Sequence, residues 1–211
     1  MVVRNFCKNL PDDPAILLMD IWDTIPVPLR PRTPTFVICE SLFCGLARMW
    51  LQFGFPFNGT EEEETYLDWK DSEVWAWATA RQDNKYFVFL GLEERLKNGR
   101  RAFCQNIEYS IYHELGHIYH WSKLGSLGKD RKPEEREELF ANLYAAMMFC
   151  HYRKNGKFHG FFEKWTREAS KFISSIKGGV DLSTRYGVAK AKKMLAALDH
   201  ADDDSLKKAL G

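Results

Sequence analysis

The positions of the prolines limit where this chain can form long regular elements. Seven of its eight prolines lie at or before Pro56, and four of them fall within residues 26–34. Proline fixes φ, lacks a backbone N–H and disfavours helix in the residue before it, so this part of the chain is unsuited to long elements. We therefore expect residues 1–60 to form an N-terminal extension with one helix, over about residues 36–53, where apolar residues recur near helical spacing.

The composition describes a folded protein without an obvious polyanionic partner. The 211 residues include 45% apolar residues, and 30 Lys and Arg nearly balance 29 Asp and Glu, which leaves a net charge of +1. That content supports a hydrophobic core, and the balance gives no global field for nucleic acid or a membrane surface. No apolar run approaches the ~18 residues of a membrane span, and the five cysteines include no CxxC pair. We expect a cytoplasmic protein that binds neither membrane nor nucleic acid directly.

The rest of the chain predicts an α+β fold. Two stretches rich in aromatic and β-branched residues flank a polar turn at residues 82–84 and indicate a β-hairpin. A helix is predicted from Phe103 to about Trp121, because four apolar residues follow each other at helical spacing, namely Ile107, Ile111, Leu115 and Ile118. A second helix is expected to start at Pro133. These elements define a core over residues 61–155, with a small antiparallel sheet beside two helices.

A C-terminal helical segment is expected over residues 156–211. Apolar residues between Phe162 and Ile176 share one helical face, and a further helix is expected to begin with Ser183 as its N-cap.

The predicted helix over residues 103–121 carries the sequence HELGH, with His113 and His117 four residues apart. Residues at this spacing lie on one helical face, so both imidazoles can reach a single metal ion. Glu114 lies about 100° around the helix, where it can act as a general base without being a ligand. This pattern is typical of zinc-dependent hydrolysis.

A catalytic zinc has three protein ligands and one open position, so a third ligand must come from elsewhere. His120 is about 60° off the face of the other two histidines, which favours either a packing role or contact with a ligand over binding the metal itself. Carboxylates after Pro133 and two later histidines are the other possibilities, and the residues alone leave open Glu134, Glu135, Glu137, Glu138, His151 and His159.

HELGH, followed 21 residues after its second histidine by ELFANLYAAMMF, resembles the ImmA/IrrE family of gluzincin metallopeptidases. The resemblance covers about residues 85–150, with Glu138, Ala141 and Asn142 fitting the family's second helix. It implies a zincin-like fold, a Zn²⁺ ion held by His113, His117 and Glu138, and Glu114 as catalytic base. Asn142, one turn after Glu138, is placed to fix the tautomer of a ligand histidine.

The resemblance also implies regulatory proteolysis of a separate protein chain, such as a helix-turn-helix transcriptional repressor, in a phage, stress or defence response. One alternative is a SprT-like protease of DNA–protein crosslinks, which would use a third histidine and a basic region. The other is a zinc-bound regulator that cuts nothing.

Two further hypotheses concern access to the metal. Cys104 could cap the ion as a redox-sensitive thiolate, provided that it precedes the helix. An extended substrate could pair with an edge of the hairpin, at residues 74–80 or residues 86–90, with Trp75 and Trp77 forming side-chain pockets.

Overall fold

The computed structural model describes residues 1–7, 14–42, 44–45, 48–49, 76–80, 85–92, 99–124, 134–154 and 180–200. The chain forms two compact units, of which the first comprises Met1–Leu18 and Thr33–Cys104 and the second Met19–Arg32 and Gln105–Gly211. The described residues form four α-helices and one four-stranded sheet, which agrees with the expected α+β class. None of the described helices is both long and apolar enough to cross a lipid bilayer.

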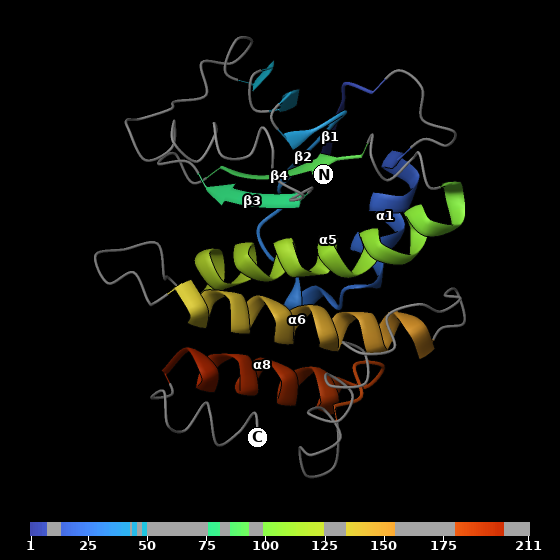
Figure 1. Ribbon diagram of the computed structural model, residues 1–211. Coiled ribbons are helices and arrows are strands. Elements are labelled where there is room, and N and C mark those ends of the chain that lie inside the picture. Colours follow the sequence, from blue (N-terminus) through green and yellow to red (C-terminus); the bar gives the residue numbers. More distant parts are fainter. Residues whose placement is uncertain are drawn as a thin grey trace. The chain divides into compact units, whose positions relative to one another are not determined.

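The sheet of the first unit is mixed, and not antiparallel as expected. Its strands are β1 (Val2–Asn5), β2 (Thr35–Cys39), β3 (Ala76–Ala80) and β4 (Tyr86–Gly91), in the order β1-β2-β4-β3 (Figure 1). β2 pairs parallel with both β1 and β4, whereas β3 pairs antiparallel with β4. A parallel pair needs a long crossover, and the segment between β1 and β2 contains the helix α1 (Pro14–Thr24).

The helix expected over residues 36–53 is wrong in its first part, because these residues form β2. Phe36, Val37, Ile38 and Cys39 are all buried, so both faces of the strand are covered. A parallel strand covered on both faces is apolar throughout and shows no alternation, so a short apolar run of this kind can be mistaken for a helical turn. Helical backbone begins only at Leu42, and residues 43, 46, 47 and 50–53 of the predicted helix lie outside the described ranges.

The predicted β-hairpin is confirmed. β3 and β4 pair from Ala76 opposite Leu90 to Ala80 opposite Tyr86. All six residues of β4 are buried, and Phe87 and Phe89 pack with Val37, Leu42 and Met49 in one core cluster. Trp77 packs against this cluster with its ring stacked on that of Phe89 at 5.7 Å.

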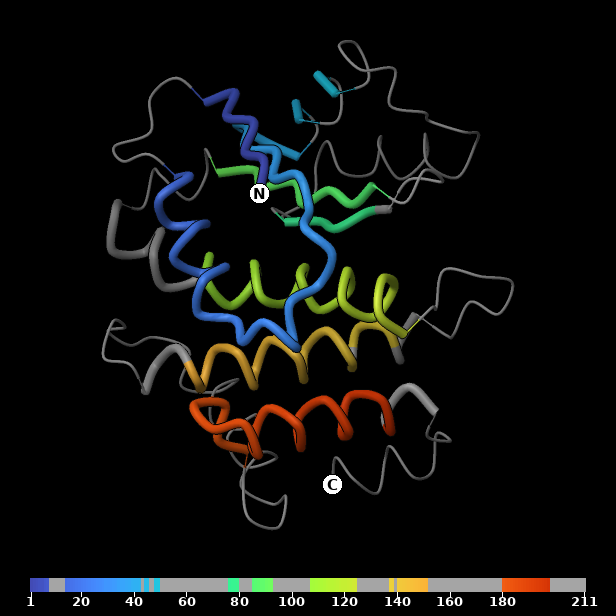
Figure 2. Tube along the Cα trace, turned by 180° about the vertical axis from the view of Figure 1, so that it is seen from behind, coloured from blue at the N-terminus to red at the C-terminus, as the bar shows by residue number. Residues whose placement is uncertain are grey.

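The described part of the second unit, which includes α5 from Gln105 onward, is built from helices. α5 (Gly99–Lys123) and α6 (Glu134–Lys154) match the two predicted core helices, and α6 lies between α5 and α8 (Arg185–His200) in both Figure 1 and Figure 2. The four apolar residues that predicted α5 are buried, each at most 1% exposed. Residues 24–29, which include the short helix η1 (Val27–Leu29), are hydrogen-bonded to two of these helices. Tyr112 Oη on α5 donates to Thr24 Oγ1 at 2.6 Å, and Tyr144 Oη on α6 donates to the Leu29 carbonyl at 2.8 Å.

Helix α8 begins one residue later than expected. The N-cap is Thr184, whose Oγ1 accepts a hydrogen bond from the backbone N–H of Gly187 at 3.0 Å. The predicted cap, Ser183, instead donates its hydroxyl to Asp181 Oδ1 at 2.7 Å, since both residues belong to the turn before the helix. The helix expected between Phe162 and Ile176 lies outside the described residues.

Candidate metal centre

Helices α5 and α6 come into direct backbone contact at Gly116. A Cβ atom at Gly116 would lie 2.8 Å from the Cα and 3.0 Å from the carbonyl oxygen of Ala141. Only a residue without a side chain permits so close an approach. In sequence Gly116 lies between His113 and His117, and Ala141 lies between Glu138 and Asn142. The contact therefore brings the two motif segments together.

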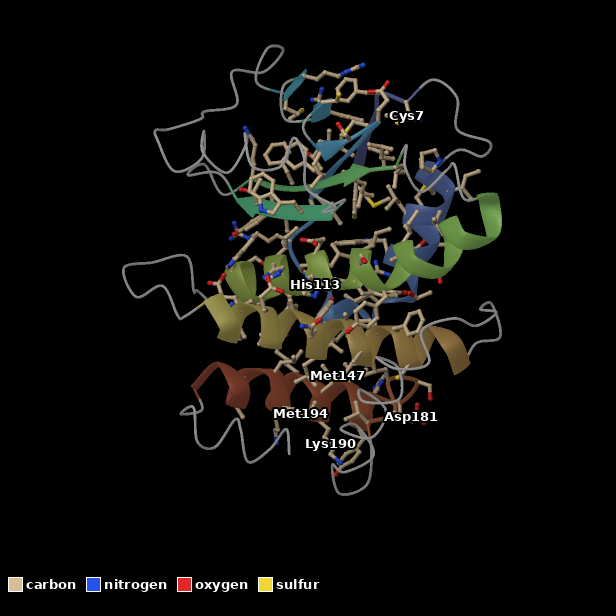
Figure 3. All side chains as sticks on the ribbon, in the orientation of Figure 1. Cys7, His113, Met147, Asp181, Lys190 and Met194 are labelled. Carbon is tan, nitrogen blue, oxygen red and sulfur yellow. The ribbon has the colours of Figure 1, made fainter. Side chains whose placement is uncertain are left out.

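Three side chains from the two helices converge on one point. His113 Nε2 is 3.2 Å from Glu138 Oε2, His117 Nε2 is 3.3 Å from Glu138 Oε1, and the two Nε2 atoms are 3.2 Å apart. Figure 3 shows His113 on the side of α5 that faces α6. The residues are His113, His117 and Glu138, so this cluster could hold a metal ion.

Asn142 orients one of the histidines. Its Oδ1 lies 3.1 Å from His113 Nδ1 and accepts the hydrogen of that nitrogen. In the neutral ring the single proton is therefore held on Nδ1, and the free lone pair is on Nε2, the nitrogen next to His117 and Glu138. Tyr109 Oη, one turn before His113, donates to the backbone oxygen of Asn142 at 3.4 Å and ties this residue to α5.

The charges within the cluster favour a cation. Hydrogen bonds from His113 and His117 hold the pKa of the Glu138 carboxyl well below its usual range. Burial by itself lowers the pKa of His113, but its hydrogen bond to Glu138 and the charges of Glu114 and Glu138 outweigh that effect, so the pKa is raised. Without a metal the cluster thus binds a proton, and a metal ion must displace it.

His117 is held in a different way from His113. Its ring stacks on the ring of Trp121, with 5.5 Å between centroids and 24° between planes. Its Nδ1 atom is buried and has no hydrogen-bond partner among the described residues. The two histidines meet edge to face at 83°, so their Nε2 atoms point to one place from different directions.

Glu114 follows His113 on α5 and is 7% exposed. Its charge contributes to the raised pKa of His113, which places the carboxylate close enough to act on the cluster electrostatically. It is not one of the three converging residues. Glu114 thus lies outside the three-residue cluster, and its role as general base stays a prediction.

The other possible ligands that the structure describes do not join the cluster. His120 is 1% exposed, and its ring packs on Phe140 at 4.6 Å, so it has the packing role that its helical angle suggested. His151 follows Glu138 on α6 by 13 residues, which is about 20 Å of helix. Glu137 points away from Glu138 on the same helix and is not part of the cluster. The side chains of Glu134 and Glu135, and the whole of His159, lie outside the described residues.

The structure changes two hypotheses about access to the metal. The thiolate cap required Cys104 to precede the helix, but α5 starts at Gly99 and includes Cys104, so that condition is not met. Residues 86–90 cannot pair with a substrate, because β4 is hydrogen-bonded to β2 on one side and β3 on the other. β3 remains an edge strand among the described strands, while Trp77 packs into the core and Trp75 lies outside the described residues.

Sequence reasoning missed two residues of the centre, Gly116 and Trp121. A glycine inside a helix is unfavourable by about 1 kcal/mol relative to alanine, so Gly116 was a signal of close packing. Trp121 follows His117 by four residues and therefore shares its helical face.

Comparison of the chain with models of known protein families, with curated proteins and with solved structures found no match.

Proposed function

We propose that this protein is a zinc-dependent endopeptidase of the gluzincin type, with Zn²⁺ bound by His113, His117 and Glu138. The observation that supports this most directly is the triangle of ligand atoms, with sides of 3.2, 3.2 and 3.3 Å. Atoms bound to one tetrahedral zinc at 2.0–2.1 Å are about 3.3 Å from each other. Two imidazoles and one carboxylate are also a ligand set found in catalytic zinc sites.

The exposure of the cluster favours a catalytic site over a structural one. The side chain of Glu138 is 51% exposed, whereas those of His113 and His117 are 17% and 10% exposed. Structural zinc sites are closed by four protein ligands, whereas catalytic sites keep one position open. Among the described residues three possible ligands converge and one side of the cluster is exposed, which fits the second kind of site.

The roles of the residues follow from this arrangement. Bound zinc supplies a Lewis acid that polarises a peptide carbonyl and makes water acidic near neutral pH. Glu114 accepts the proton of the attacking water and then passes it to the nitrogen of the leaving amine. Asn142 holds a proton of His113 on Nδ1, which leaves Nε2 as the nitrogen that would bind the metal, and Gly116 lets α6 carry Glu138 to the histidines.

The proposed substrate is a separate cytoplasmic protein, cut in an extended linker. A helical backbone uses its carbonyls in its own hydrogen bonds, so a flexible segment is the more accessible target. The resemblance of HELGH and of Glu138–Asn142 to the ImmA/IrrE family supports regulatory cleavage of a helix-turn-helix repressor in a phage, stress or defence response. The three-ligand set with a carboxylate argues against the SprT-like alternative, which uses a third histidine.

The test combines metal content with peptide cleavage. We expect one zinc per chain in the wild type, its loss in His113→Ala and in His117→Ala, and cleavage of a quenched fluorescent peptide library by the wild type. Glu114→Gln should keep its zinc and its fold but lose cleavage, and Glu137→Gln serves as the matched carboxylate control. A wild type without zinc refutes the proposal. Cleavage by Glu114→Gln at the wild-type rate refutes the mechanism, and a zinc-loaded wild type that cuts no peptide supports the zinc-bound regulator instead.

A further inference from the structure

We propose that Trp121 is the positioning residue for His117, and this inference rests on the metal site proposed above. The two histidine ligands differ in what fixes their rings. His113 is oriented by a hydrogen bond from its Nδ1 to Asn142 at 3.1 Å. For His117 the described residues offer no such bond to the buried Nδ1, whereas the flat face of its ring lies on Trp121.

Helix geometry explains why this contact forms. Side chains on a helix lean toward its N-terminus, so the side chain at position 121 extends back over the turn that carries His117. α5 is still regular there, since the Leu124 N–H bonds to the His120 carbonyl at 3.1 Å. Trp121 is therefore presented by a fixed backbone, and its large, rigid ring can hold the imidazole at the angle of 24° that is observed.

The stacking does for His117 what Asn142 does for His113, by a different interaction. An imidazole that rotates freely about its side-chain bonds presents Nε2 to the metal only part of the time. A ring stacked on indole keeps Nε2 directed toward His113 and Glu138, at 3.2 and 3.3 Å. Residues that orient a metal ligand contribute about 10- to 100-fold to metal affinity. We place Trp121 at the lower end of this range, because stacking constrains a ring less tightly than a hydrogen bond does.

The first arm of the test measures zinc affinity by competition with a chelator, using the full chain. Trp121→Ala should bind zinc about tenfold more weakly than the wild type. Trp121→Phe keeps a flat aromatic face and should recover most of that loss, whereas Trp121→Leu keeps an apolar side chain without the face and should not. Lys123→Ala is the matched control, since Lys123 is exposed in the same last turn of α5. Circular dichroism establishes that each variant retains its helices.

The second arm has a readout that a purely structural role would leave unchanged. Cobalt(II) replaces zinc as the probe, and its visible absorption bands report the directions of the ligand atoms. The bands should shift in Trp121→Leu and coincide with those of the wild type in Trp121→Phe and in Lys123→Ala. A wild type that binds neither zinc nor cobalt refutes the metal site itself. A wild type that binds both, with Trp121→Ala and Trp121→Leu unchanged in affinity and bands, refutes the role of Trp121 alone.

Discussion

Replacing Gly116 with alanine tests whether helix contact sets the geometry of the metal centre. The new Cβ would lie 2.8 Å from Ala141 Cα, 3.0 Å from its carbonyl oxygen and 3.2 Å from Tyr144 Cβ. Non-bonded carbon atoms prefer separations of at least about 3.5 Å, so α6 must move away from α5 by about 0.7 Å. The nearest atoms are backbone atoms, which cannot turn aside as the end of a flexible side chain can.

Two effects on stability oppose each other in Gly116→Ala. Alanine is better than glycine in a helix by about 1 kcal/mol, whereas overpacking a close contact costs about 1–3 kcal/mol. We expect a net loss of about 0–2 kcal/mol in the free energy of unfolding. The effect on the metal should be larger. Functional side chains must be held within about 0.5 Å, and a shift of about 0.7 Å exceeds that tolerance, so zinc affinity should fall at least about tenfold.

The assay compares chelator competition with thermal unfolding of the metal-free protein. Gly187→Ala is the control, because a Cβ there would collide with the Asp181 carbonyl oxygen, on an element that carries none of the ligands. Gly187→Ala should lower the melting temperature and leave zinc affinity unchanged, whereas Gly116→Ala should lower affinity out of proportion to its effect on melting. Wild-type zinc affinity in Gly116→Ala would show that the contact does not set the site.

Three further predictions concern the ligands. Glu138→Gln should weaken zinc binding at least about 100-fold in a chelator competition, and Glu137→Gln about twofold at most, because only Glu138 faces the histidines. Asn142→Ala should lower zinc affinity about tenfold, because it frees the His113 ring. Asn142→Asp should raise zinc affinity, because it adds a negative charge. Equal zinc affinities of the wild type and both variants by calorimetry would contradict this. Because the pKa of His113 is raised, the protonated ring stabilises the metal-free protein below the ordinary pKa of 6.5, and this stabilisation is lost as pH rises through the raised value. Zinc competes with that proton, so zinc affinity should rise with pH over the same range. Calorimetry in buffers of different ionisation enthalpy measures the protons released on zinc binding. A zinc affinity that is independent of pH would refute the coupling.

The cluster of possible metal ligands could largely be predicted from the sequence because the positions of its histidines depend on local structure. His113 and His117 are one helical turn apart, so a confirmed helix is enough to bring them onto one face. Glu138 could not be chosen from spacing alone, since Glu134, Glu135 and Glu137 all lie in the first turn of the same helix. The resemblance selected it, and the convergence of the three side chains agrees with that choice.

The sheet was less readable because its pairing is not local. β1 pairs with β2 at an offset of 33 residues, as between Val2 and Thr35, and nothing near Val2 in sequence indicates that partner. β2 is buried on both faces and so lacks the alternation that identifies a half-exposed strand. The hairpin of β3 and β4 was identified because its partners are adjacent in the chain.

The complete burial of β4 also bears on how the protein behaves when it is not folded. Its sequence, YFVFLG, contains no charge and no proline, and five of its six residues are aromatic or aliphatic. Such segments stack readily with copies of themselves when they are exposed. In the native chain the backbone of β4 is hydrogen-bonded by β2 and β3 on its two sides. Release of either neighbouring strand, during synthesis or under heat, would uncover a segment prone to aggregation, so correct placement of β2 protects the solubility of the whole chain.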